Sequence, residues 1–503
     1  MVEESRDTAE HHAARRKRRR LGCLAILLTP VVLLAVLLGL FGLRLLEKPK
    51  ITHDYLAEFN ERYEGVPEPD KAWPLYKQAI LLRLTNPHPK ANDSLWLSYP
   101  GWSDWDAARE RIEALAPSLE LIRQGAGKPI FGKALSLEED PDIVKAQGGP
   151  GMFAAMSVSA DDNPLWMSMI TMDDLGYFRK MAKDLAQDTR IAMEDGQVER
   201  AIENIEAMLG VAAHVAESET ILNLLTRCAA DALACGTLER VLHDYPQAFT
   251  DADLARLQRA FMTIGLDGLR DDGGLTRNPL KLSMERAYYE DMVQRIYSDD
   301  GKGDGHMTLA GTNMVLVPMP GLMIVVLADS RKDAVKAYDQ HEDRFLELAR
   351  LQPFERGDGL EQMLAEQAEY ESNTFLQARQ PLGTMIPNWP MMIRALDKLN
   401  TERDAAITVI ALHRYRLAHG DFPPALDQLV PEFLPTLPLD PMDGKPLRYR
   451  LKTSGPVLYS IGADGFDGGG VRAEEEQDAY PGAESPDDGD WVLYPLAMPV
   501  EDE

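Results

Sequence analysis

The residues of this chain whose types and spacing could do chemistry are gathered near its C-terminus, in residues 459–470, YSIGADGFDGGG. Five glycines and two aspartates, Asp464 and Asp467, follow a strand-like run at 457–460. So much glycine excludes a helix, because glycine loses more backbone freedom there than any other residue. The stretch is therefore either a slack linker or a loop that bends tightly around something. Glycines let backbone carbonyls approach one ion closely, and carboxylate and carbonyl oxygens are the ligands that calcium prefers.

The common catalytic motifs are absent from the sequence. It contains no HExxH, no GxSxG and no glycine-rich phosphate loop followed by Lys and Ser or Thr. The ten histidines are scattered, and those in helical patterns, such as His214 and His413, are expected to be packed or surface residues. The sequence therefore predicts no catalytic residues.

Acidic and aromatic residues of the N-terminal half keep one enzymatic alternative open. Paired carboxylates at 138–140 and 173–174 could serve glycosidic chemistry, although adjacent acids in loops are more often solvated charge. Four tryptophans could line a glycan groove or, more commonly, anchor a core: Trp73, Trp102, Trp105 and Trp166. A cell-envelope hydrolase with its site in this region is the alternative.

The charge balance limits the partners that the chain can bind. The net charge is -28, and the first fifty residues hold ten Lys or Arg against five Asp or Glu, so the remainder is more acidic still. An acidic body of this size repels nucleic acid, so we expect no nucleic-acid partner. It fits either an ordinary solvated surface or the binding of divalent cations.

The three cysteines predict neither a disulfide nor a cysteine metal site. Cys23 lies in an apolar N-terminal run, while Cys228 and Cys235 are seven residues apart in a helical pattern. Two helical turns separate the latter pair by roughly 10 Å, which is beyond disulfide reach.

The N-terminus indicates where the protein resides. A basic cluster at 15–20 precedes an uncharged run at 21–43, which is long enough to cross the ~30 Å hydrocarbon core. No small-residue cleavage site closes the run. We expect a basic cytoplasmic tail (1–20) and a retained transmembrane signal anchor (21–46), with the remainder outside the cytoplasm. The localisation is then the bacterial inner membrane, crossed once, with a periplasmic body.

Helical periodicity dominates residues 51–400, which we predict to be a helical extracytoplasmic region of one or two subdomains. Residues 185–215 have the pattern of a helix, a short turn at 194–196 and a second helix with an apolar face, similar to one helical-repeat hairpin. The apolar run 314–328 is short and contains Pro318 and Pro320. It is expected to be a buried core segment, with a second membrane crossing as the alternative.

The sequence pattern changes from helical periodicity to one helix followed by strand-like runs in residues 401–503, which we predict to be a separate α+β domain. Residues 401–419 form an amphipathic helical pattern that Gly420 ends. Strand-like runs follow at 447–451, 457–461 and 491–494. The predicted fold class is α+β: a transmembrane helix, a large helical region, and a small C-terminal unit of one helix and an antiparallel sheet.

Motifs of this C-terminal unit occur in a distinctive order: LHRYRLAHGDFPPALDQLV, FLPTLPLDPMDGKPLRYR, VLYSIGADGFDGGG and DDGDW. Over about residues 405–496 this order resembles the C-terminal domain of the major pseudopilin of bacterial type II secretion systems. In pseudopilins the membrane helix directly precedes this domain, whereas here residues 51–400 separate the two. This departure, and the lack of the family's glutamate in the run 21–43, argue against incorporation into a filament.

The resemblance implies a calcium ion that fixes the acidic loop between the last strands. Asp464 matches the aspartate of the family's Gly-Ala-Asp-Gly motif, and Asp487 and Asp488 match its later acidic pair. Asp467 and Asp490 are supplementary candidates without a firm counterpart. The loop runs from about Phe466 to Pro486, and a three-stranded sheet buries too little to order a loop of that length, so calcium would help to order it. The alternative is a disordered acidic loop without an ion.

Together these patterns predict a membrane-anchored extracytoplasmic scaffold, not an enzyme. It would carry a calcium-stabilised, pseudopilin-like C-terminal domain and bind envelope or secretion proteins. The alternatives are the envelope hydrolase and a component of a type II secretion-like machine, recruited through the C-terminal domain.

Overall fold

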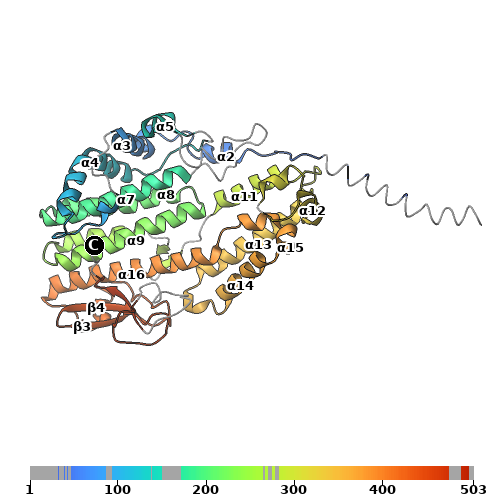
Figure 1. Ribbon diagram of the computed structural model, residues 1–503. Helices are drawn as coiled ribbons and strands as arrows, with labels where there is room; N and C mark the ends of the chain where they lie inside the picture. The colour runs from blue at the N-terminus through green and yellow to red at the C-terminus, as the bar shows by residue number, and fades with distance from the viewer. Residues whose placement is uncertain are drawn as a thin grey trace, which may run out of the picture. The chain divides into compact units, whose positions relative to one another are not determined.

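The computed structural model describes residues 47–85, 93–136, 139–149, 172–263, 267–269, 275–277, 282–315, 317–474 and 489–497, with Val32, Gly39 and Gly42 (Figure 1). The described elements are mainly helices, with one small three-stranded antiparallel sheet. This composition confirms the α+β class. The predicted tail and nearly all of the predicted anchor at 21–46 lie outside the described residues, so the anchor stays a prediction.

The chain divides into two compact units. Unit 1 comprises Met1–Thr52, Met292–Ala337 and Tyr370–Met385, and unit 2 comprises His53–Asp291, Tyr338–Glu369 and Ile386–Glu503. The boundary between them falls within three helices: α11 (Ser283–Ile296), α13 (Arg331–Arg350) and α14 (Gly359–Ser372).

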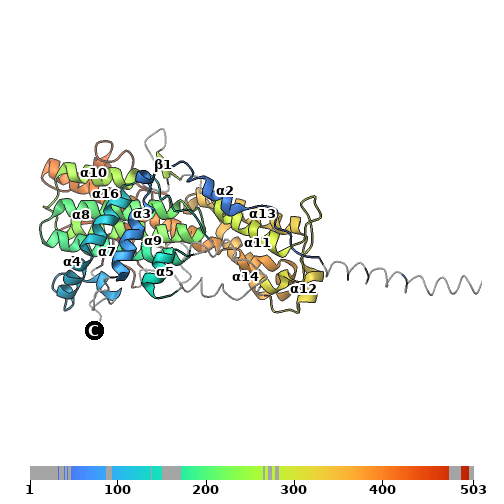
Figure 2. The same cartoon turned by 90° about the horizontal axis from the view of Figure 1, so that it is seen from above.

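Unit 2 is a layered stack of helices with a sheet on one side. α3 (Trp73–Thr85) packs against α4 (Trp105–Ala126), and α4 packs on α7 (Met172–Glu194) and α8 (Val198–Ala216) (Figures 1 and 2). α9 (Ile221–Asp244) packs on α7 and α8, and α16 (Trp389–His419) packs on α9 and α10 (Asp251–Thr263). A short antiparallel pair, β1 (Asp267–Leu269) and β2 (Leu275–Arg277), lies apart from the main sheet. The other described α-helices that lie wholly within unit 2 are α2 (Tyr55–Glu61) and α5 (Pro141–Gln147).

The predicted helical hairpin at 185–215 is confirmed as the α7–α8 pair. α7 ends at Glu194, where Gly196 adopts a φ of 72° that non-glycine residues rarely adopt. Ile202 and Ile205 of α8 are fully buried, and Glu199 and Glu203 point to solvent. The apolar stripe that defined the pattern therefore faces the core.

Helix α9 is long and apolar but is a core helix of unit 2. It is the one described helix with the length and hydropathy to cross a membrane, and most of its apolar stretch is buried among other parts of the protein. Thr220 caps its N-terminus by accepting a hydrogen bond from the Asn223 N–H. Its two cysteines, Cys228 and Cys235, are buried free thiols.

Helix α16 extends the predicted C-terminal helix by twelve residues at its start. Asn388 caps the new N-terminus, and Gly420, at a φ of 92°, ends the helix as predicted. The amphipathic pattern was wrong for its middle, because residues 405–413 are buried on every side. They are enclosed because α9, α10 and the strand β5 (Trp491–Tyr494) all pack on this helix. α16 also runs without a break through the predicted domain boundary at 400–401.

The predicted strands form one sheet in the order β3-β4-β5. They are β3 (Arg448–Lys452), β4 (Gly455–Ser460) and β5 (Trp491–Tyr494), within two residues of their predicted bounds. β4 buries side chains on both faces: Leu458 belongs to the main core, while Val457 and Tyr459 form a second cluster with Val492 of β5. Because the side chains on this second, outer face are buried, another segment of the chain must cover it.

Unit 1 is small and includes the described residues nearest the predicted anchor. Its helix α12 (Gly321–Leu327) packs on α15 (Thr374–Arg379) and on the short helix η4 (Gly311–Met314). Residues 298–306 form a loop that is closed by a bridge between Tyr297 and Met307.

The segment 314–328 is only partly the buried core that its sequence predicted. Val315, Ile324 and Val325 are buried, but Leu322, Met323 and Val326 are about half exposed or more. Its helix has seven residues and is roughly 10 Å long, against the ~30 Å of a hydrocarbon core, so it cannot be a second crossing.

Candidate functional site

The glycine loop that follows β4 covers the outer face of the sheet. A side chain at Gly470 would lie 3.1 Å from Val457 and 3.4 Å from Tyr459, and one at Gly469 would meet the Arg450 guanidinium at 2.7 Å. Both glycines have positive φ, 81° for Gly469 and 77° for Gly470. The described loop is thus tightly bent onto the sheet and is not a slack linker.

The loop bends around the carboxylate of Asp490. Oδ1 of Asp490 accepts a hydrogen bond from the Gly468 N–H at 3.1 Å, and Oδ2 accepts from Gly470 at 2.6 Å and from Val471 at 3.0 Å. Asp490 itself is fully buried. Closely spaced N–H groups next to left-handed residues form an anion-binding nest, and here the anion is a side chain of the same chain.

The other described metal candidates have local partners. Oδ1 of Asp467 accepts hydrogen bonds from the Tyr459 hydroxyl at 3.0 Å and from the Gly469 N–H at 2.9 Å. Oδ1 of Asp464 accepts the Phe466 N–H at 2.9 Å, which makes a local turn. Burial and the bond to Asp467 raise the pKa of Tyr459, so its hydroxyl stays a donor.

The calcium site stays a prediction. Asp487 and Asp488 lie outside the described residues. Within the described ranges, no three His, Cys, Asp or Glu side chains are grouped so as to hold a metal ion. Amide donors, not carbonyls, converge on Asp490. The described metal candidates that lie outside this nest are Asp464 and Asp467.

A second carboxylate, Asp440, ties the DPMDG turn to the end of β4 and was missed by sequence reasoning. It is fully buried and accepts hydrogen bonds from the Ser460 hydroxyl at 2.7 Å, the Ile461 N–H at 3.0 Å and the Met442 N–H at 3.0 Å. Arg448 donates to it at 2.9 Å. Burial raises the pKa of Asp440, while these partners oppose the rise. An Asp-Pro turn followed by a strand was the available signal.

A pocket of about 220 Å³ lies beside this C-terminal unit, within unit 2. Glu239 and Arg240 of α9 line it together with Glu402 of α16 and Trp491 of β5. Arg240 donates a hydrogen bond to the Ala497 carbonyl at 2.6 Å, which fixes the last described segment over the pocket. The sequence analysis named tryptophans of the N-terminal half as candidates for such a pocket and did not include Trp491. Trp491 reaches the pocket only because β5 packs on α16, which is a long-range contact.

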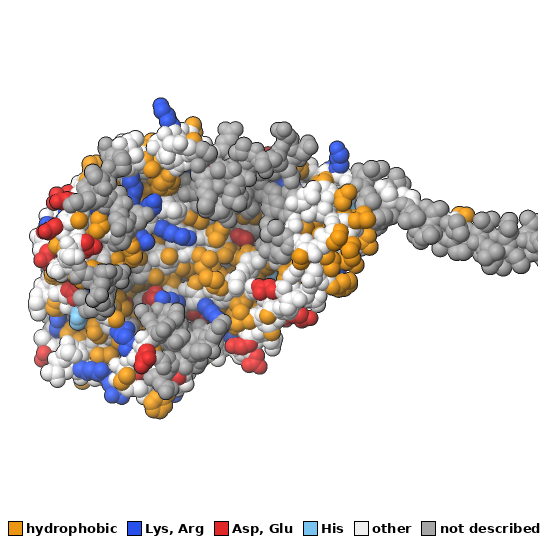
Figure 3. All heavy atoms as spheres, in the orientation of Figure 1, with side chains coloured by type: hydrophobic (Ala, Val, Ile, Leu, Met, Phe, Trp, Pro, Cys, Tyr) orange, Lys and Arg blue, Asp and Glu red, His pale blue; other side chains and the backbone are white. Residues whose placement is uncertain are grey.

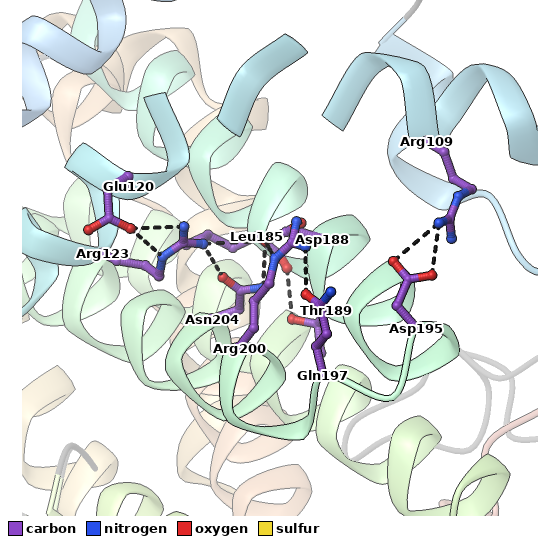
Figure 4. A network of polar contacts seen from close by, with 10 residues as sticks. All are labelled: Arg109, Glu120, Arg123, Leu185, Asp188, Thr189, Asp195, Gln197, Arg200 and Asn204. Carbon is purple, nitrogen blue, oxygen red and sulfur yellow. Dashed lines mark hydrogen bonds and ion pairs between the residues drawn. The ribbon is translucent and has the colours of Figure 1, made fainter. Parts of the chain in front are cut away.

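The helical body contains a buried cluster of hydrogen bonds and ion pairs around Asp188 of α7, which we call the buried joint (Figure 4). Asp188 is fully buried and accepts hydrogen bonds from Arg123 of α4 at 3.3 Å, from Asn204 of α8 at 2.8 Å and from Arg200 of α8. One carboxylate therefore joins three helices. Sequence reasoning missed it because acids in helices are usually solvated.

The histidines singled out in the sequence are packed residues. Nε2 of His214 donates to the Lys128 carbonyl at 2.9 Å, so its Nδ1 accepts the Tyr76 hydroxyl at 2.8 Å. Burial lowers the pKa of His214 and brings that of His413 to about 3, which keeps both rings neutral. Nε2 of His413 lies 3.3 Å from the Tyr494 hydroxyl.

The N-terminal tryptophans also serve packing where they are described. Trp73 and Trp105 pack against the main core, and Trp102 contacts the Tyr99 ring at 5.1 Å. Trp166, residue 138 and the side chains of Asp173 and Asp174 lie outside what the structure describes.

Comparison of the chain with protein-family profiles, with curated proteins and with solved structures finds no match.

Proposed function

We propose that this chain is a membrane-anchored extracytoplasmic scaffold that presents a pseudopilin-like C-terminal unit to a protein of the cell envelope. The apolar run at 21–43 and the preceding basic cluster support the anchor. The ordered motifs of 405–496 support the pseudopilin-like character. The burial of α16 in unit 2 supports a sheet that is held firmly on the helical body, because α9 and α10 enclose the helix on which the sheet packs.

One observation carries the proposal: large apolar side chains are exposed on a C-terminal unit whose loops are held in place by hydrogen bonds to buried carboxylates. Phe466 is 72% exposed, Val471 is 60% exposed and Leu451 is 47% exposed. Val471 is itself one of the three donors of the nest that holds Asp490, and the Phe466 N–H donates to Asp464, so hydrogen bonds to carboxylates set the backbone position of both residues. Exposed apolar side chains on a rigid element are typical of a protein-binding surface.

Site-specific photocrosslinking in intact cells tests this role. A photoreactive phenylalanine analogue at Phe466 should give a discrete adduct with an envelope protein. The same analogue at Met391, which is 60% exposed near the start of α16, is the matched control. Equal adducts at both positions, or none at Phe466, would reject the binding surface. An adduct with a secretion-machine subunit would favour the third role, a component of that machine.

The calcium part of the proposal has its own test in the full chain. Calcium should raise the Tm, with a gain of about 2.7 kcal/mol at about one hundred times the Kd, because a ligand of the native state stabilises it. Magnesium is the control cation. The D487N/D488N double variant should lose the rise while leaving the Asp490 nest intact. A Tm that does not respond to calcium in the unaltered chain rules the ion out.

A second candidate, the cell-envelope hydrolase, is favoured by the pocket beside β5. Two carboxylates, Glu239 and Glu402, line it, and glycan hydrolysis uses two acids. Purified full-length protein should then release sugar fragments from peptidoglycan, and E239Q and E402Q should each abolish the release. An inactive unaltered protein removes this candidate.

A further inference from the structure

Unit 1 carries a cluster of exposed apolar side chains that its own fold leaves uncovered. We call this cluster the unit 1 patch. Figure 3 shows hydrophobic side chains gathered over the region that carries α12. The members lie beside η4, on α12 and on α15, and are Leu309 (42% exposed), Leu322 (50%), Met323 (49%), Val326 (61%) and Phe375 (59%).

Helix α12 is apolar on both of its faces. Ile324 and Val325 point into the protein, while Leu322, Met323 and Val326 point outward. A surface helix of a water-exposed domain normally places polar residues on its outer face. An apolar outer face of this kind, continued by neighbouring elements, marks a contact with a partner or with lipid.

The described residues nearest the predicted anchor are bound to unit 1. Glu47 forms an ion pair with His306 at 3.3 Å, and the Thr52 N–H donates to the Gln294 side chain at 3.0 Å. Only three residues lie between residue 43, the end of the uncharged run, and Glu47, so the four steps of chain span at most about 14 Å. Leu309 of the patch follows His306 by three residues, which is a reach of about 11 Å at most.

We propose that the unit 1 patch inserts into the surface of the same bilayer that the anchor crosses. The inference rests on the anchor of the proposed function. A short tether keeps unit 1 at the headgroup layer, where apolar side chains enter the boundary with the acyl chains to a depth of roughly 5–10 Å. Lipid is the occupant that this position favours, because the membrane is within reach of every copy of the chain.

Depth-sensitive fluorescence in vesicles tests the insertion with the full chain. Val326→Cys is labelled with an environment-sensitive nitrobenzoxadiazole probe in a Cys23→Ser background, since Cys228 and Cys235 are buried. Leu451→Cys on β3, at 47% exposure in the unaltered chain, is the matched control. The vesicles contain phospholipid with a nitroxide near the headgroup end of its acyl chain.

We expect blue-shifted emission at position 326 and quenching by the lipid nitroxide that is several-fold stronger than at position 451. Equal quenching at the two positions would overturn the insertion. A blue shift without lipid quenching would also overturn it, since the cover is then a second copy or another segment of this chain. A chain that does not float with vesicles refutes the anchor; a floating chain with no quenching at 326 refutes the patch alone.

Discussion

Buried carboxylates organise the C-terminal unit at the scale of single residues. Asp490 holds the glycine loop through three amide donors, and Asp440 joins the DPMDG turn to β4 through Ser460 and Ile461. Each acid lies in a place that water does not reach, so each is stable there only because its partners satisfy both of its oxygens. The loop is therefore ordered by the chain's own anions.

Replacing Asp440 by Asn should lower the free energy of unfolding by about 1–3 kcal/mol, because a donor amide group would face buried donors. Denaturant unfolding of the full chain measures the change. Asp443→Asn is the control: Asp443 also binds Arg448 but is partly exposed, so its loss should cost less than about 1 kcal/mol. Equal losses would show that Asp440 is not the organising residue.

Glu217 should make the stability of the protein depend on pH. Burial raises the pKa of its carboxyl from 4.5 to about 7, although it accepts the Phe131 N–H at 2.8 Å. The folded state holds the proton more tightly than the unfolded chain, so this group lowers the free energy of unfolding as pH rises from 4.5 to about 7.

Glu217→Gln keeps an acceptor for Phe131 and removes the charge. Thermal unfolding from pH 4.5 to 8 should then show the variant gaining stability over the unaltered protein as pH rises, with most of the gain complete slightly above pH 7. A difference in Tm that does not change with pH would contradict the assignment.

At the scale of elements, the buried joint on α7 determines how three helices meet. Asp188 contacts α4 through Arg123 and α8 through Arg200 and Asn204 (Figure 4). The nearby pair of Arg109 and Asp195 also links α4 to the end of α7, but both side chains are more than a quarter exposed. Asp188 and Asp195 both accept from an arginine of α4 but differ in burial, which makes them a matched test.

Asp188→Ala should destabilise the protein by about 3 kcal/mol, because it leaves cationic donors without their buried acceptor. Asp195→Ala should cost less than about 1 kcal/mol, because water replaces the lost partner. Guanidinium titration of both variants gives the comparison. Similar midpoints for the two would mean that burial does not strengthen the joint.

At the scale of the whole molecule, α16 connects the helical body of unit 2 to its sheet. Residues 405–413 are enclosed by α9, α10 and β5, so the C-terminal unit is built into the body and is not suspended from it. Unit 1 includes the residues next to the predicted anchor and carries the exposed patch.

The excised fragment 401–503 should not fold on its own. Removing α9 and α10 exposes a helix face that includes Ile407 and Ile410, and so small a sheet buries too little to compensate. Calorimetry and circular dichroism of the fragment should show no cooperative transition. A sharp transition with native-like strand content would support the predicted boundary at 400–401 instead.

The sequence alone determined the elements that depend on near neighbours. Helical periodicity and Gly196 defined the α7–α8 hairpin, Gly420 marked the end of α16, and short strand-like runs marked the three strands. These signals are local, since a stop residue or a repeat of 3.6 or 2 acts within a few positions. The same locality made the spacing of Cys228 and Cys235 sufficient to predict that these two form no disulfide with each other.

Only the tertiary structure decided which faces are covered and which charges are enclosed. Asp490 fills the glycine nest from some twenty residues away, and Asp188 is buried because α4 and α8 close over it. Conversely, Val326 is exposed although its segment reads as core. An apolar or acidic residue has the same sequence pattern whether or not a distant element packs on it, because burial is a property of long-range contacts.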